Sequence, residues 1–422
     1  MNLNLLEKLN DKQREAASQI DGSILILAGA GSGKTRTITY RIAHMIENVG
    51  ISPYSILAVT FTNKAAKEMR ERVEELVGDV AKACTISTFH SFGMRLLRMY
   101  ASEVGYNPNF TIYDTDDQKR IVKAILKGQN ISFNGVKLTE RDIVSIISKI
   151  KEEIKTLDEY SVINKQIIEV YDKYNKALLE SNAMDFSDIL LNTYKLLQKP
   201  EILEKVQNKY KYIMIDEYQD TNNLQYKIID LIARKSSNLC VVGDENQSIY
   251  GFRGANILNI LNFENNYNNA KIIKLEENYR STTTILDAAN ELIKNNKSSK
   301  DKKLWTQNGK GDLIKVLACD NARDEVSRII EIIKENHQNG VPYRDMTILY
   351  RTNAQSRVFE EGLLRYNIPH KVFGGISFYS RAEIKDIIAY LSIIVNPQDE
   401  LNLQRIINVP KSTCGRTFWR WK

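Results

Sequence analysis

Short apolar runs alternate with helical patterns over the first hundred residues of the chain. The predicted strands are Ile24–Leu27, Ile56–Thr60 and Cys84–Ser87, and the predicted helices are Arg36–Glu47, Lys64–Val77 and Phe92–Glu103. The strand runs are apolar throughout instead of alternating with polar residues, which is typical of strands buried on both faces. We therefore predict an α/β fold with a parallel sheet that carries helices on both sides.

The pattern changes between about residues 116 and 197, where long Lys-, Glu- and Ile-rich stretches repeat with a period of 3.6 residues. Arg141–Lys155 and Val162–Ser181 are the clearest of these, and they predict a helical insertion. Beyond the insertion, further strands are predicted at Tyr212–Ile215, Leu239–Val242, Ile272–Leu275, Leu313–Leu317 and Thr347–Tyr350. A new block begins near Asn278.

Composition adds limits to this picture. A chain of 422 residues is too long for one ordinary domain. Its net charge of +7 permits a nucleic-acid partner without requiring one. The four cysteines lack metal-ligand spacing, and Cys84 and Cys240 lie in apolar runs where buried free thiols are expected. These cysteines and a polar start without a signal sequence predict a cytoplasmic protein, and no apolar run reaches the length of a membrane span.

A glycine-rich segment follows directly on the first predicted strand, and it reads Ala28-Gly29-Ala30-Gly31-Ser32-Gly33-Lys34-Thr35. Strand, glycine loop, Lys-Thr and helix form the layout of a P-loop, in which backbone N–H groups surround phosphate oxygens. Lys34 is placed to reach the β- and γ-phosphates, and the Thr35 hydroxyl is placed to bind Mg²⁺. The segment departs from the strict pattern at Ala28, where a glycine is usual. It predicts a nucleoside triphosphate site.

Other polar residues follow the later strands. Asp216 and Glu217 come directly after the predicted strand Tyr212–Ile215. Such a pair predicts an Mg²⁺ ligand and a residue that orients or deprotonates the attacking water. Gln247 follows Leu239–Val242 and is placed to sense a γ-phosphate, although an exposed loop glutamine is commonplace. Arg280 follows another strand and fits an arginine finger, whereas composition alone favours a surface arginine.

The motifs occur in an order that resembles motifs I, Ia, Ib, II, III and IV of superfamily 1A DNA helicases, the UvrD/PcrA/Rep group. The matching segments are Ala28–Thr35, Thr60–Ala66, Thr88–Phe92, Ile215–Asn222, Gly243–Asn256 and Asn278–Ser281. Leu9–Ala16 is similar to the Q motif of the family, and Lys303–Thr306, Leu349–Arg357 and the stretch from Phe373 to Asp386 also match. The resemblance implies a RecA-like P-loop domain with a helical insertion and a second, incomplete RecA-like domain.

Roles for the nucleotide site follow from the resemblance. Gln13 binds adenine, with Arg36 and Tyr279 packing on the base, while Lys34, Thr35, Asp216 and Glu217 keep the roles given above. Gln247 and Arg280 couple the γ-phosphate to movement between domains.

The resemblance also implies a groove for single-stranded DNA, lined by Phe61, Thr88, His90, Tyr250, Phe252, Arg253, Arg351 and Asn353. Phe252 stands where the family usually has tryptophan. Without the family, the aromatic residues would be interpreted as core residues and His90 as a satisfied polar residue at a helix start. Met184–Asp188 resembles a junction motif, and it also fits an ordinary helix N-cap.

The implied domains are 1–112 with 187–278 (ATP-binding domain 1A), 113–186 (insertion 1B), 279–380 (partial domain 2A) and 381–422 (start of domain 2B). The implied activity is that of an ATP-dependent 3′–5′ DNA helicase or translocase in repair or replication, acting on single strands and single-strand/duplex junctions. Motifs V and VI do not occur before Lys422, and the residues from Ser412 onward do not continue the pattern. We therefore expect this chain to bind ATP and single-stranded DNA weakly and to hydrolyse ATP slowly. The alternatives are an ATP- and DNA-binding fragment that does not unwind, or the helicase part of a helicase–nuclease.

Overall fold

The computed structural model describes residues 5–128, 131–133, 136–153, 165–267, 269–296, 302–373 and 381–409. Two compact units are present: the larger unit is Met1–Asp312 with Val395–Leu401, and the smaller unit is Leu313–Ile394 with Asn402–Lys422. Several sequence predictions lie outside the described residues, namely those for Lys155, Val162–Asn164, Gly374, Gly375 and the chain from Pro410 onward, with Cys414.

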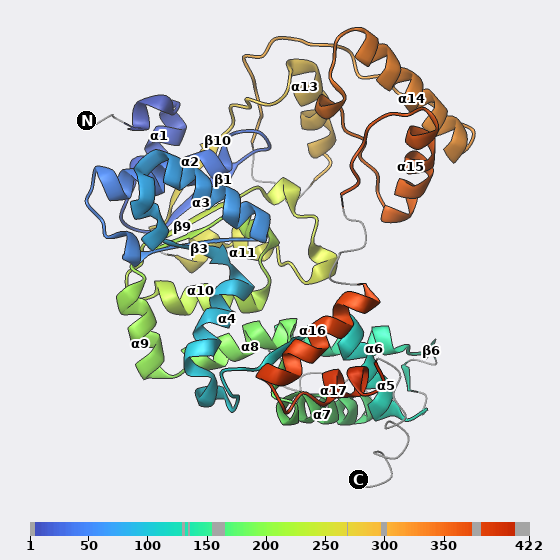
Figure 1. Cartoon of the computed structure of the whole chain (residues 1–422). Helices are drawn as coiled ribbons and strands as arrows, with labels where there is room; N and C mark the ends of the chain where they lie inside the picture. The colour runs from blue at the N-terminus through green and yellow to red at the C-terminus, as the bar shows by residue number, and fades with distance from the viewer. Residues whose placement is uncertain are drawn as a thin grey trace. The chain divides into compact units, whose positions relative to one another are not determined.

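A six-stranded sheet forms the centre of the larger unit, in the order β10-β1-β9-β8-β2-β3 (Figure 1). The strands are β1 (Ile24–Ala28), β2 (Ile56–Thr60), β3 (Thr85–Thr88), β8 (Tyr212–Ile215), β9 (Leu239–Gly243) and β10 (Lys271–Leu275). Every neighbouring pair is parallel. The predicted parallel sheet is confirmed, because each predicted strand of this region lies within two residues of an observed one.

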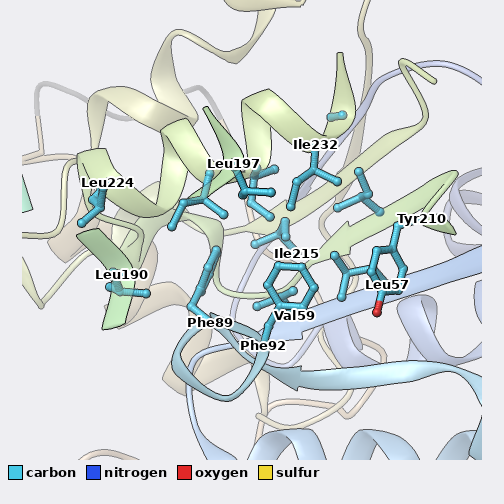
Figure 2. Close-up of a cluster of buried hydrophobic side chains, with 14 of the residues drawn as sticks. Leu57, Val59, Phe89, Phe92, Leu190, Leu197, Tyr210, Ile215, Leu224 and Ile232 are labelled. Atoms are coloured by element: carbon cyan, nitrogen blue, oxygen red, sulfur yellow. The ribbon is translucent and has the colours of Figure 1, made fainter. Parts of the chain in front are cut away.

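Alternate residues of the strands point into two apolar cores. On one face, Leu57, Val59 and Ile215 pack with side chains such as Phe92 and Ile232 (Figure 2). The helices that supply this core are α4 (Phe89–Tyr100), α8 (Phe186–Leu197), α9 (Pro200–Lys209) and α10 (Asn223–Ala233). The other face packs on α2 (Lys34–Glu47) and α3 (Asn63–Val77). Burial of each large apolar side chain stabilises the fold by about 1.5–3 kcal/mol, which holds the sheet rigid beneath its loops.

The predicted helical insertion contains α5 (Thr115–Leu126), α6 (Glu140–Glu153) and α7 (Lys165–Glu180). It also contains strands too short to give a recognisable pattern. They are β4 (Thr111–Tyr113), paired with β7 (Ala183–Asp185), and β5 (Ser132–Phe133), paired with β6 (Val136–Lys137). The Tyr113 hydroxyl donates to Asp399 at 2.6 Å, which joins the segment Val395–Leu401 to the larger unit. The remaining helices of this unit are α1 (Asp11–Ser18), α11 (Leu258–Leu261), α12 (Phe263–Asn266) and α13 (Thr283–Ile293).

The smaller unit is built around α14 (Ala322–Gln338) and α15 (Ser356–Arg365), whose core includes Ile330 and Phe359. By residue range, α16 (Ala382–Val395) belongs to this unit up to Ile394, and α17 (Glu400–Ile406) belongs to it from Asn402 onward. The strands predicted at Leu313–Leu317 and Thr347–Tyr350 are wrong, because neither segment is a strand. A strand needs a neighbour for its backbone hydrogen bonds, and no segment among the described residues pairs with either. Thr347–Tyr350 instead lines an open hollow of about 1090 Å³.

No helix within the described ranges is both long and apolar enough to cross a membrane.

Candidate nucleotide and nucleic-acid site

Four of the matching segments follow strands that are neighbours in the sheet. The P-loop follows β1, Asp244 follows β9, Asp216 follows β8 and Asn278 comes after β10. Because the strands are parallel, their carboxyl ends meet at one edge, which is where ligands bind in open α/β sheets. The fold therefore brings together side chains that are far apart in the sequence.

The P-loop requires glycine for two separate reasons. Gly31 and Gly33 have φ angles of 68° and 85°, in the left-handed region that other residues seldom adopt. A Cβ atom on Gly29 would lie 2.2 Å from Cδ2 of Leu304, so this glycine allows the close approach of another chain segment. Ala28 is the last residue of β1 and pairs with Leu275, a position at which glycine is not needed. Helix α2 begins at Lys34 and directs its N-terminal N–H groups toward the loop.

The acidic pair lies beside the P-loop lysine. Lys34 Nζ is 4.0 Å from Glu217 Oε2 and 3.4 Å from the carbonyl oxygen of Ala28. Glu217 adopts a left-handed backbone (φ 51°, ψ 46°), and its N–H donates to Asp216 Oδ1 at 3.0 Å. Non-glycine residues held in this conformation are concentrated at functional sites.

Asp216 is buried, and burial together with the charge of Glu217 raises the pKa of Asp216 to about 7, although Lys34 opposes the shift. A divalent cation would hold such a carboxyl group ionised. The Asp216 carboxylate and the Thr35 hydroxyl are the hard oxygen donors that Mg²⁺ prefers, and Mg²⁺ commonly takes its other ligands from phosphates and water. The described residues contain no cluster of three or more His, Cys, Asp or Glu side chains suited to a metal. Two oxygen donors beside a phosphate-binding loop fit Mg²⁺ that is brought with a nucleotide.

Asn278 ties the segment after β10 to the P-loop. Its Nδ2 donates to the carbonyl oxygen of Ala30 at 2.6 Å, and its Oδ1 accepts the N–H groups of Arg280 and Ser281 at 2.8 and 2.7 Å. Tyr279 N–H adds a hydrogen bond to the carbonyl oxygen of Gly31 at 3.0 Å. Arg280 is thus held beside the loop. Asn278 could not be assigned a role from the sequence, because an asparagine before Tyr-Arg carries no distinctive signal of its own.

The three residues predicted to contact adenine make hydrogen bonds to the P-loop or to the segment just before α1. Gln13 is buried, and its Nε2 donates to the carbonyl oxygen of Ser32 at 2.9 Å. Tyr279 is half exposed, and its hydroxyl accepts from Asn10 Nδ2 at 2.6 Å. Arg36 donates to the carbonyl oxygen of Lys8 at 2.9 Å. Their contact with a base stays a prediction.

A chain of hydrogen bonds connects Gln247 with Glu217. Gln247 Nε2 donates to Asp244 Oδ2 at 2.7 Å, and the N–H of Asp244 donates to Gln219 Oε1 at 2.9 Å. Gln219 Nε2 then donates to Glu217 Oε2 at 2.9 Å. Gln219 is buried, and sequence reasoning missed it because nothing local shows which carboxylates its amide reaches.

Aromatic residues of the segments that follow β2 and β9 form a partly exposed cluster. The rings of Phe61 and Tyr250 stack at 5.1 Å with an interplanar angle of 28°, and the Phe252 ring lies 6.1 Å from Tyr250. The Arg253 guanidinium lies 5.0 Å from the Tyr250 ring. Phe252 is 72% exposed, so it is not a core residue. Exposed rings with a cation provide a surface on which nucleic-acid bases can stack regardless of sequence.

The other predicted DNA contacts are more dispersed. Thr88 caps α4 by accepting the N–H of Ser91 at 3.2 Å, and the His90 ring meets the Phe186 ring edge-on at 5.9 Å. Arg351 and Asn353 are exposed residues of the smaller unit. Asp185 caps α8, in agreement with the N-cap interpretation of Met184–Asp188.

Comparisons with known proteins agree with this geometry. The family model described as the UvrD/REP helicase N-terminal domain matches residues 9–268, and the UvrD-like helicase C-terminal domain matches residues 273–420. The chain is 49% identical over 417 residues to the ATP-dependent DNA helicase PcrA of Staphylococcus aureus and to that of Staphylococcus epidermidis. Each match covers 97% of this chain and 57% of the relative. The chain therefore spans little more than half the length of these relatives.

Proposed function

Because the chain belongs to the UvrD/REP helicase family, we propose that it binds ATP with Mg²⁺ and hydrolyses it to drive movement along single-stranded DNA. The observation that carries this proposal is a single edge of the sheet holding the P-loop, the Asp216–Glu217 pair and the Glu245–Gln247 turn. Unwinding with 3′–5′ polarity, and a role in DNA repair or replication, rest on the family resemblance and belong to the same proposal.

The residues divide the chemistry among them. The P-loop N–H groups and Lys34 bind the phosphates, where their positive charge stabilises the negative charge of the transition state. Thr35 and Asp216 would hold Mg²⁺, which supplies charge neutralisation at the phosphate oxygens. Glu217 orients the attacking water and accepts its proton, and its contact with Gln219 Nε2 at 2.9 Å restricts where its carboxylate can lie. Gln247 and Arg280 respond to the γ-phosphate.

DNA is held beside this site by stacking. Phe61, Tyr250 and Phe252 offer ring faces to the bases, and Arg253 adds positive charge for the backbone. Tyr250 comes three residues after Gln247, so a change at the γ-phosphate reaches the base-stacking surface through few bonds. This proximity is the proposed link between hydrolysis and movement.

The test is hydrolysis by the 422-residue chain with and without a thymidine oligonucleotide. We expect DNA to stimulate hydrolysis, and Glu217→Gln to lower kcat by roughly 10²–10⁴-fold while nucleotide binding persists. Glu204→Gln, on the exposed surface of α9, is the matched control and should leave kcat unchanged. An unstimulated wild-type chain, or an active Glu217→Gln variant, would refute the proposal.

Strand displacement separates unwinding from simple binding. Duplexes with a 3′ or a 5′ single-stranded tail are offered with ATP, and any displacement is expected to be slow and confined to the 3′-tailed duplex. DNA-stimulated hydrolysis without displacement of either duplex would favour the alternative of an ATP- and DNA-binding protein that does not unwind.

A further inference from the structure

Lys302 places a buried positive charge between two acidic residues of the turn that contains Gln247. Its Nζ lies 2.7 Å from Asp244 Oδ1 and 2.8 Å from Glu245 Oε2. The Lys302 side chain is 3% exposed, and those of Asp244 and Glu245 are 5% and 0% exposed. Removing three such charges from water is costly, so they persist together only because they compensate one another.

The contact matters because Asp244 faces Gln247 with its other oxygen. Asp244 Oδ2 accepts a hydrogen bond from Gln247 Nε2 at 2.7 Å, while Oδ1 also accepts the N–H of Asn246 at 3.1 Å. An ionised carboxylate can only accept hydrogen bonds. It therefore fixes the Gln247 amide with its nitrogen toward Asp244, so that the amide oxygen can accept a hydrogen bond from water.

Lys302 belongs to the stretch of chain that follows Arg280 and α13. A second residue of this stretch touches the same turn, since Asn296 Nδ2 donates to Asn246 Oδ1 at 2.8 Å. The stretch is anchored at its far end by Trp305, whose N–H donates to the carbonyl oxygen of Glu276 at 3.1 Å. The Glu245–Gln247 turn is thus anchored to the segment that also carries Arg280, the candidate arginine finger.

We infer that Lys302 is a positioning residue for ATP hydrolysis, which orients Gln247 through Asp244 and ties the γ-phosphate sensor to the segment after Arg280. This inference rests on the proposed function. Lys302 acts through its two carboxylate partners, Asp244 and Glu245.

Because charged groups surround Asp244, the effect of Lys302 on ATP hydrolysis should depend on pH. Burial alone would raise the pKa of Asp244, but Lys302, with help from Gln247 and Lys34, holds it below its ordinary value. Glu245 shares the Lys302 ammonium. Without the ammonium, Asp244 would ionise only at higher pH, and a protonated Asp244 could donate to Gln247 and let its amide turn over.

The variants are Lys302→Met and Lys302→Arg, with Lys303→Met as the control at an exposed neighbouring position. For Lys302→Met, we expect the DNA-stimulated kcat to fall on the order of 10²-fold and the KM for ATP to change little, because the nucleotide ligands stay in place. The loss should shrink as pH rises, and Lys302→Arg should recover most of the rate. An unchanged kcat, an equal loss in Lys302→Arg, or a loss independent of pH would overturn the inference.

A second readout does not require hydrolysis. Amide hydrogen exchange across Asp244–Gln247, measured without nucleotide, should be faster in Lys302→Met than in the wild type or Lys303→Met. Unchanged exchange would also overturn the inference. A wild-type chain that fails to hydrolyse ATP would refute the proposed function instead, and the exchange experiment would still decide the role of Lys302.

Discussion

The Nζ atom of Lys151 lies 2.8 Å from the Oδ2 atom of Asp185, and neither side chain is more than 1% exposed. The same ammonium lies 2.8 Å from Asp188 Oδ1, and Tyr174 donates its hydroxyl to Asp185 at 2.9 Å. Burial alone would lower the pKa of Lys151, but the charges of Asp188 and Asp185 raise it, so the lysine stays protonated. Since Asp185 caps α8, this pair joins α6 of the insertion to a helix that covers the sheet.

Replacement of Lys151 by Met should destabilise the larger unit by about 3–5 kcal/mol, because it leaves two carboxylates buried without a cation. Urea unfolding followed by hydrogen exchange of α6 and α8 measures the change in the free energy of unfolding. Lys149→Met, at an exposed position of the same helix, should change it by less than about 0.5 kcal/mol. A Lys151→Met variant as stable as its control would show that the pair contributes nothing.

The sheet could be predicted from the sequence because its strands are buried on both faces and read as continuous apolar runs. The P-loop and Asp216–Glu217 were recognisable because their residue types and spacing are set by local chemistry. Leu313–Leu317 shows where the same rule fails, since an apolar run becomes a strand only if another strand lies beside it. Whether a partner exists depends on tertiary structure.

The residues that support the site were not predictable in this way. Lys302 lies in a lysine-rich stretch and reads as a solvated surface residue, yet its ammonium is buried against Asp244. Asn278 and Gln219 have no local pattern that reveals which loops they join. Such contacts link positions far apart in the chain, so they become visible only once the fold has brought the segments together.

Gly31→Ala should abolish most hydrolysis. A Cβ atom at Gly31 would lie 2.6 Å from Asn278 Nδ2 and 2.8 Å from Arg280 Cβ, and the φ angle of 68° strains any residue other than glycine. Displacement of these neighbours should lower kcat on the order of 10²-fold. Gly50→Ala is the matched control, because Gly50 has a φ angle of 76° with nothing within 4 Å, so it tests backbone strain without the clash. Equal rates in the two variants would contradict the packing explanation.

Phe252→Ala should weaken binding of single-stranded DNA while leaving thermal stability unchanged, because the ring is 72% exposed and supports no core. Loss of one stacked base costs about 1–3 kcal/mol, which corresponds to a Kd increase on the order of tenfold to a hundredfold. Fluorescence anisotropy with a labelled thymidine oligonucleotide measures it. Phe252→Trp should bind at least as tightly as the wild type, since the larger ring offers more stacking area. Tyr54→Ala, an equally exposed aromatic in the 3₁₀ helix Pro53–Ser55, should have no effect.

His90 should make the stability of the larger unit depend on pH. Burial lowers the pKa of His90 below its ordinary value of 6.5, although a hydrogen bond with the Phe186 backbone opposes the shift. The folded state therefore favours the neutral imidazole, so its stabilising contribution is complete above pH 6.5 and is lost as pH falls through the folded-state pKa. The thermal midpoint of the wild type should consequently drop more between about pH 7.5 and about pH 5 than that of His90→Gln. His44→Gln, which removes a histidine whose Nδ1 lies 3.0 Å from Asn48 Oδ1 in an exposed contact, should retain the full wild-type drop. Parallel pH profiles for the wild type and His90→Gln would show that His90 is not the group responsible.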